Sequence, residues 1–133
     1  MEEKKKISVL IVEDDENIRD FLREVLDDFL ISTARDGDEA IAKIRESKFD
    51  LVITDLRMPN VPGEEVVRFL HDYKPATKVI VISGYSSQYA VTQSVTNGAN
   101  AFLSKPFSIK ELIQTVSNVL GSDENHDQNP NYR

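Results

Sequence analysis

The sequence predicts an α/β fold, a (βα)5 arrangement in which a doubly wound, parallel five-stranded sheet carries helices on both faces. Short apolar runs recur along the chain, and segments with helical periodicity separate them. Turn signals such as Asp36-Gly37 and Asn97-Gly98 lie between the apolar runs and the helical segments. Strands that alternate with helices in this way are typical of doubly wound sheets. The length of 133 residues suits one domain with a single core.

Five short apolar runs are the expected strands. They cover residues 7–12, 31–34, 49–54, 78–83 and 100–104. The first, third and fourth, which read ISVLIV, FDLVIT and KVIVIS, are almost continuously apolar and rich in β-branched residues. This composition is expected of strands that are buried on both faces of a parallel sheet.

Helical periodicity fills the gaps between these strands. Apolar residues recur with the i, i+3, i+4, i+7 spacing of one helix face in the segments 18–29 and 109–119, and shorter apolar clusters at 40–44 and 66–70 suggest two further helices. The segment 86–97 has only two clear apolar anchors, Val91 and Val95, and we expect a more weakly anchored helix there.

Composition and charge are those of a soluble globular protein. Apolar residues make up 40% of the chain and charged residues 29%, and 16 basic against 23 acidic residues give a net charge of -7. This balance disfavours direct binding to nucleic acid or to an anionic membrane, because both require a basic surface. The absence of cysteine excludes disulfides and cysteine-ligated zinc. With no signal peptide and no run of roughly 20 apolar residues, we expect a cytoplasmic protein.

The stretch IVEDDEN, residues 11–17, places four acids directly after the first apolar run. Like charges held close together repel, and removing them from water is costly. The repulsion is relieved if the acids spread out in water or if a cation lies among them. Acids at the start of a helix also favour the helix dipole, which is an ordinary structural explanation for this stretch taken by itself.

The other unusual residues also fall at strand ends. In an open α/β sheet, ligands bind outside the carboxyl ends of the strands. The residues expected at that edge are Glu13, Asp14 and Asp15 after the first strand, Asp55 after the third, Ser83 after the fourth and Lys105 after the fifth. Each alone has an ordinary explanation as a turn residue, a helix cap or a surface lysine. Together they supply carboxylates from two strands, a hydroxyl and an ammonium group.

This set of groups suits a hard cation and a phosphoryl group. Oxygen ligands without cysteine or paired histidine select a hard cation, and Mg²⁺ fits because it takes a few carboxylates together with waters and phosphate oxygens. Aspartyl phosphorylation needs such a cation, because the incoming group is anionic and the charge of the nucleophilic carboxylate must be neutralised. In this interpretation Mg²⁺ bridges Asp55 and the phosphoryl group, while Lys105 and Ser83 contact the remaining phosphoryl oxygens.

These residues and their intervals resemble the receiver domain of two-component response regulators, over Lys6 to about Leu120. The motifs are Glu13-Asp14, Asp55-Leu56-Arg57-Met58-Pro59 followed by Gly63, Val79-Ile80-Val81-Ile82-Ser83-Gly84, and Phe102-Leu103-Ser104-Lys105-Pro106-Phe107. The resemblance implies a flavodoxin-like sheet with strand order 2-1-3-4-5 and a receiver domain over residues 5–120. The polar segment 121–133 is expected to be a disordered tail.

The resemblance also implies a role for each site residue. Asp55 is the expected phosphoacceptor, and Lys105 and Ser83 are the expected catalytic residues beside it. The expected metal-site residues for Mg²⁺, for which Mn²⁺ is an acceptable substitute, are Glu13, Asp14, Asp55 and the backbone carbonyl of Arg57. Asp14 is the expected direct ligand beside Asp55, and Glu13 is expected to act mainly through water. Glu13 stands where the family often has Asp, and Asp15 is expected to cap or solvate the first helix.

Three further expectations follow from the same resemblance. Ser83 and Phe102 would form a switch pair, with Phe102 as an ordinary core residue the alternative. The peptide bond between Lys105 and Pro106 would be cis. Arg57 and Tyr85 would flank the attacking water, so that a bulky Tyr85 would prolong the lifetime of the aspartyl phosphate.

The implied function is that of a signalling module of a two-component system or phosphorelay. It would accept a phosphoryl group from a histidine kinase or phosphotransfer protein and change the surface of its fourth helix, fifth strand and fifth helix. Its chemistry would be limited to self-catalysed transfer to Asp55 and hydrolysis, so it is not expected to be an enzyme. It would be either a regulator of the single-domain type or a piece of a larger one, without direct contact to nucleic acid or membrane.

Three other classes of protein compete with this interpretation. One is a phosphorylation-independent pseudo-receiver that acts only as an interaction module. A hydrolase of the haloacid dehalogenase type usually has a second Asp two residues after the nucleophile, where Arg57 stands here. A flavodoxin- or Rossmann-type cofactor domain needs a phosphate loop after the first strand, where Glu13, Asp14 and Asp15 stand instead.

Overall fold

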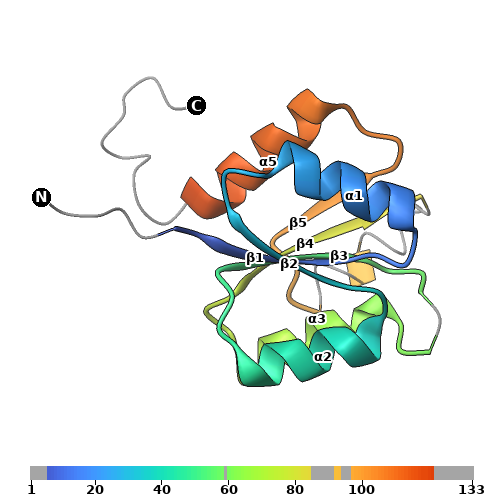
Figure 1. Cartoon of the computed structure of the whole chain (residues 1–133). Helices are drawn as coiled ribbons and strands as arrows, with labels where there is room; N and C mark the ends of the chain where they lie inside the picture. Colours follow the sequence, from blue (N-terminus) through green and yellow to red (C-terminus); the bar gives the residue numbers. More distant parts are fainter. Residues whose placement is uncertain (1–5, 59, 85–91, 94–96, 122–133) are drawn as a thin grey trace, which may run out of the picture.

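Five parallel strands form the central sheet in the computed structural model of the chain (Figure 1). They are β1 (Ser8–Val12), β2 (Leu30–Ala34), β3 (Leu51–Asp55), β4 (Lys78–Ser83) and β5 (Ala101–Ser104). Their order is β2-β1-β3-β4-β5, which confirms the predicted doubly wound, flavodoxin-like sheet. The structure describes residues 6–58, 60–84, 92–93 and 97–121.

Helices cover both faces of this sheet. They are α1 (Glu16–Val25), α2 (Gly37–Glu46), α3 (Gly63–Tyr73) and α5 (Ile109–Gly121). Figure 1 shows α1 and α5 on one face and α2 and α3 on the other. The helix expected at 86–97 lies largely outside the described residues, as does the tail after residue 121. Within the part that the structure describes, no helix is both long and apolar enough to cross a membrane.

The core consists of two apolar layers, one on each face of the sheet. Successive side chains of a strand point to opposite faces, so β1, which is buried from Val9 to Val12, contributes to both layers. Val9 and Ile11 pack in the layer beneath α1 and α5, and Leu10 and Val12 pack in the layer above α2 and α3. This double burial explains why the runs that form β1, β3 and β4 are continuously apolar rather than alternating.

The apolar periodicity that predicts the first helix continues beyond its end. Helix α1 stops at Val25, with Leu26 as its C-cap, yet Leu26 and Phe29 still pack in the layer beneath α1 and α5. The chain turns here with its apolar side chains facing inward, so burial follows the pattern while the backbone leaves the helix. A spacing pattern reports the buried face more directly than it reports the last helical residue.

The register of the sheet brings the polar strand ends to one edge. Asp55 at the end of β3 pairs with Ile82, next to Ser83 at the end of β4. The backbone N–H of Lys105 donates to the carbonyl of Ser83 at 2.9 Å, and that of Glu13 donates to the carbonyl of Ala34 at 3.0 Å. These two bonds extend the parallel pairing by one residue beyond β5 and β1. Residues from four strand ends are therefore held at fixed positions by backbone bonds.

A close backbone approach holds the loop after β3. Gly63 begins α3, and its N–H donates to the carbonyl of Leu56 at 3.0 Å. A Cβ at this position would collide with the carbonyl oxygen of Asp55 and would lie 2.7 Å from the Cα of Leu56. Real side-chain atoms do not come so close to backbone, so residue 63 must be glycine for the loop to close against Asp55.

The Gly63→Ala substitution is expected to lower the free energy of unfolding by about 2 to 3 kcal/mol, because the backbone around Asp55 must move to admit the methyl group. Gly84→Ala is the matched control, since the nearest heavy atom to a Cβ there is the Cβ of Lys105 at 4.0 Å, an ordinary contact. Urea denaturation of both variants measures the effect. Equal stabilities for the two variants would contradict the close approach.

Candidate functional site

Three carboxylates gather at the carboxyl edge of the sheet. Glu13 and Asp14 follow β1 and Asp55 ends β3, and one oxygen of each lies within 4.8 Å of the others. Glu13 is 1% exposed and Asp55 5% exposed, whereas Asp14 faces solvent. Hard oxygen donors at this spacing, with one side open to water, suit a divalent cation such as Mg²⁺, which keeps several of its waters. The donor set therefore fits the metal that the sequence predicts.

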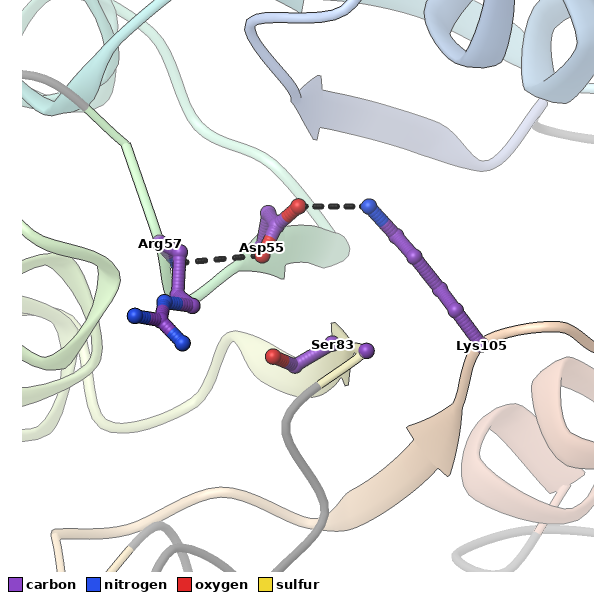
Figure 2. A pocket seen from close by; sticks show the side chains of 5 residues that line it. Asp55, Arg57, Ser83 and Lys105 are labelled. Carbon is purple, nitrogen blue, oxygen red and sulfur yellow. Dashed lines mark hydrogen bonds and ion pairs between the residues drawn. The ribbon is translucent and has the colours of Figure 1, made fainter.

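Lys105 extends from the end of β5 into this acid cluster. Its Nζ lies 2.6 Å from Oδ2 of Asp55 and 3.2 Å from Oε1 of Glu13, and Figure 2 shows the side chain reaching straight toward Asp55. Burial lowers the pKa of Lys105, but hydrogen bonds to Asp55 and Glu13 and their negative charges outweigh it, so the pKa lies above the usual 10.5. Lys105 is therefore a fixed positive charge between two buried acids.

The carboxyl group of Glu13 is the group most perturbed by this crowding. Burial raises the pKa of Glu13 from 4.5 to about 7, and the charge of Asp55 adds to the rise. The backbone N–H of Asp15, which donates to Oε2 at 3.1 Å, and the ammonium group of Lys105 act in the opposite direction. One lysine does not offset the negative charge of the whole cluster, so the site retains an attraction for a further cation.

Contacts on both sides fix the orientation of Asp55. Its Oδ1 accepts a hydrogen bond from the backbone N–H of Arg57 at 3.0 Å, and its Oδ2 accepts from Lys105. The buried hydroxyl of Thr54 donates to the backbone carbonyl of Asp55 at 2.9 Å, and Gly63 packs against the same carbonyl. The carboxylate thus points in one direction, toward the opening of the site.

A cavity of about 330 Å³ opens beside Asp55. It is lined by Asp55, Arg57, Ser83, Gly84 and Lys105. Ser83 is fully buried at the end of β4. Figure 2 shows it around the same pocket as Asp55, Arg57 and Lys105. A cavity that offers a carboxylate, a hydroxyl and an ammonium group provides contacts for a small anion once a cation offsets the charge of the acids.

The remaining predicted residues occupy different places. Phe102 lies in the middle of β5, paired with Val81; it is half-buried against the layer over α2 and α3, outside the cavity beside Asp55. The peptide bond between Lys105 and Pro106 is cis, as the family resemblance implies. Asp15 caps α1 by accepting from the backbone N–H groups of residues 17 and 18. Tyr85 lies outside the described residues.

Two contributing residues were not predicted from the sequence. Thr54 holds the backbone of Asp55, and Arg19 of α1 donates from Nη1 to the backbone carbonyl of Glu13 at 3.0 Å. A polar residue within the apolar run of β3 was a signal for the first. For the second, the signal was a cation near the start of a helix, where the helix dipole favours acids.

Comparison with known proteins identifies the family. The model of the response regulator receiver domain matches residues 9–117. The chain belongs to this family. Among curated relatives, the transcriptional regulatory protein ResD of Bacillus subtilis is 34% identical over 122 residues, which is 90% of this chain and 50% of ResD. The receiver domain spans about half the length of the curated relatives it matches.

Solved receiver structures agree with the fold. The chemotaxis protein CheY4 of Vibrio cholerae has a TM-score of 0.82 and 31% identity, with 87% of this chain and 100% of that chain covered. A beryllofluoride-activated NtrC4 receiver domain dimer has a TM-score of 0.80 and 32% identity, with 86% and 96% covered. The predicted family and strand order are confirmed by these likenesses and by the topology of the sheet.

The raised pKa of Glu13 predicts a pH dependence of stability. Between about pH 4.5 and pH 7 the folded receiver binds more protons than the unfolded chain, so protonation of Glu13 favours the folded state. In the metal-free protein, this contribution is present below about pH 5 and is lost as the pH rises through about 7. We expect the free energy of unfolding to fall by on the order of 1 to 3 kcal/mol from this source.

Urea denaturation in the presence of a chelator, at about pH 5 and about pH 8, measures this fall, and Glu13→Gln should remove it. Glu16→Gln, which removes an exposed acid outside the cluster, is the control and should retain it. A wild-type protein whose pH dependence matches that of Glu13→Gln would show that the carboxyl group is not perturbed in this way.

Proposed function

We propose that this receiver domain accepts a phosphoryl group on Asp55 from a histidine kinase or phosphotransfer protein, in a reaction that depends on Mg²⁺. The observation that carries the proposal is the convergence of Asp55 with Lys105 and the two other acids beside a cavity lined by Ser83. The membership in the receiver family and the likeness to a receiver domain activated by beryllofluoride support it.

The proposed chemistry is an in-line displacement at phosphorus. An oxygen of Asp55 attacks the phosphoryl group of a phosphohistidine, the new P–O bond forms as the P–N bond breaks, and the electron pair returns to the imidazole nitrogen. Mg²⁺, held by Glu13, Asp14, Asp55 and the backbone carbonyl of Arg57, would supply the positive charge that lets two anions meet.

The protein's own groups position the reacting carboxylate. The N–H of Arg57 holds Oδ1 of Asp55 and the ammonium group of Lys105 holds Oδ2, so the carboxylate is oriented before the donor arrives. Lys105 contacts Oδ2 of Asp55 before the reaction and would then contact a phosphoryl oxygen as negative charge moves onto it. Ser83, which lines the cavity, would donate to another phosphoryl oxygen.

The other predicted roles remain part of this proposal. The receiver domain would span residues 5–120, with a polar tail after it, although α5 extends one residue further, to Gly121. Arg57 and Tyr85 would set the lifetime of the phosphorylated state, and the protein would act in the cytoplasm as a signalling module rather than as an enzyme with a separate substrate. A phosphorylation-independent pseudo-receiver is not favoured, because the acids, the hydroxyl and the lysine all meet at one edge.

Acetyl phosphate with Mg²⁺ is expected to add one phosphoryl group to Asp55. Intact-mass spectrometry and peptide mapping measure the modification. Asp55→Asn should abolish it because the nucleophile is lost, and Lys105→Met should slow it by roughly a hundredfold because a charged contact to the transferring group is lost. Asp20→Asn, an exposed acid of α1, is the control and should be labelled like the wild-type protein. Undiminished labelling of Asp55→Asn would refute the assignment.

Phosphorylation is expected to alter the surroundings of Phe102. New phosphoryl oxygens would draw the Ser83 hydroxyl inward, leaving space into which Phe102 can turn. The ring resonances of Phe102 should shift when beryllofluoride and Mg²⁺ are added, and Ser83→Ala should reduce the shift. Phe49, buried before β3, provides the internal control and should stay unchanged. An identical Phe102 spectrum in both states would mark it as an ordinary core residue.

A further inference from the structure

Arg19 makes a contact that the proposed chemistry does not use. It lies near the start of α1, is half-buried, and donates from Nη1 to the backbone carbonyl of Glu13 at 3.0 Å. Long helical side chains point back toward the N-terminus of their helix, which lets Arg19 reach a residue six positions earlier. The bond thus joins the helix to the peptide group between Glu13 and Asp14, the two acids that follow β1.

The other hydrogen bonds of residues 13–15 do not involve the carbonyl of Glu13, which accepts from Arg19. The N–H of Glu13 continues the pairing with β2, and the N–H of Asp15 donates to the side chain of Glu13 at 3.1 Å. The carboxylate of Asp15 caps the helix. The carbonyl of Glu13 is held by the Arg19 side chain, not by a sheet or helix bond. Because this peptide group connects Glu13 to Asp14, its orientation sets the directions in which the two carboxylates project.

The charge of Arg19 acts against cation binding. A guanidinium group beside the acid cluster repels Mg²⁺, and the helix dipole makes this end of α1 unfavourable for a basic residue. Removing the charge alone would therefore tighten Mg²⁺ binding. Removing the hydrogen bond would loosen the peptide group between the two acids and weaken binding. The two effects have opposite signs, so a measured affinity distinguishes them.

We propose that Arg19 is a positioning residue of the cation site, which holds the peptide group between Glu13 and Asp14 so that both carboxylates face the cation. Its positioning effect on Mg²⁺ affinity exceeds the repulsion from its charge. The inference rests on the proposed function, because it concerns the Mg²⁺ that supports phosphoryl transfer to Asp55. Groups that orient metal ligands commonly change metal affinity by about tenfold or more when they are removed.

The test compares two arginines of the same helix. Arg19→Met removes the charge and the donors but keeps an unbranched stem, and Arg23→Met removes an equal charge one turn later, where Arg23 is exposed and pairs with Asp20 at 4.0 Å. Titration of the metal-free, isotope-labelled proteins with MgCl₂, followed by backbone amide shifts, gives the dissociation constants. We expect Arg19→Met to bind Mg²⁺ about tenfold more weakly than wild type, and Arg23→Met to change less than about twofold.

Two further measurements separate positioning from general damage. The carbonyl ¹³C resonance of Glu13 in the metal-free protein should shift upfield in Arg19→Met and stay in place in Arg23→Met, because only the first loses a hydrogen bond to that carbonyl. Phosphorylation of Asp55 in Arg19→Met should be slow at limiting Mg²⁺ and close to wild type at saturating Mg²⁺. If Arg19→Met does not fold, Arg19→Gln, which also loses the charge and is too short to keep the contact, serves in its place.

Each outcome decides a different point. Mg²⁺ binding by Arg19→Met that equals or exceeds that of wild type would overturn the positioning role while leaving the proposed function intact. Equal weakening in Arg19→Met and Arg23→Met would overturn it as well, since the effect would then belong to the helix and not to the contact with Glu13. Failure of the wild-type protein to bind Mg²⁺ would overturn the proposed function and this inference together.

Discussion

The ion pairs of Lys105 with Asp55 and Glu13 are the interaction on which the functional edge of this protein depends. Two nearly fully buried carboxylates from different strands lie close together, and their repulsion and loss of water would be costly without a cation between them. Lys105 comes from a third strand, and its ammonium group contacts both acids. The charges are still not balanced, since Asp14 stands beside them. That residual negative charge makes the edge attractive to a divalent cation, and a cation in turn makes it receptive to an anion.

The rest of the fold supplies rigidity to this arrangement. A parallel sheet covered on both faces leaves only its strand ends open to solvent, so chemistry is confined to one edge. The register of the buried apolar strands fixes where each strand ends relative to its neighbours. Gly63 allows the loop after β3 to close directly against the backbone of Asp55. The stability of the domain comes from the apolar layers, which is why the edge can tolerate repulsion among its acids. The buried middle of each strand therefore stabilises the domain, while the carboxyl ends of the same strands form the candidate site.

Much of this arrangement follows from sequence pattern, and the parts that do not follow have identifiable causes. Apolar runs and helical spacing predict the strands and the buried helix faces, because both patterns depend on burial. Parallel strands bring Glu13, Asp55 and Lys105 to one edge of the sheet independently of the loop conformations. The end of α1 could not be predicted, because Leu26 and Phe29 stay buried after the helix stops. The contacts of Arg19 and Thr54 with backbone carbonyls were missed because any polar residue can make such bonds, and only the folded chain shows which carbonyl lies within reach.

The same backbone bonds that fix the site also connect it to the edge of the sheet. Within the part of the chain that the structure describes, β5 is an edge strand next to β4, and its pairing places Phe102 opposite Val81 and Ser104 opposite Ser83. The N–H of Lys105 donates to the carbonyl of Ser83, so the two residues proposed to follow the phosphoryl group are joined directly. An edge strand has one neighbour to adjust to, whereas a central strand has two. In the proposed function, a charge added at Asp55 would thus act on two linked residues at the side of the sheet that can respond with the least disruption of the core.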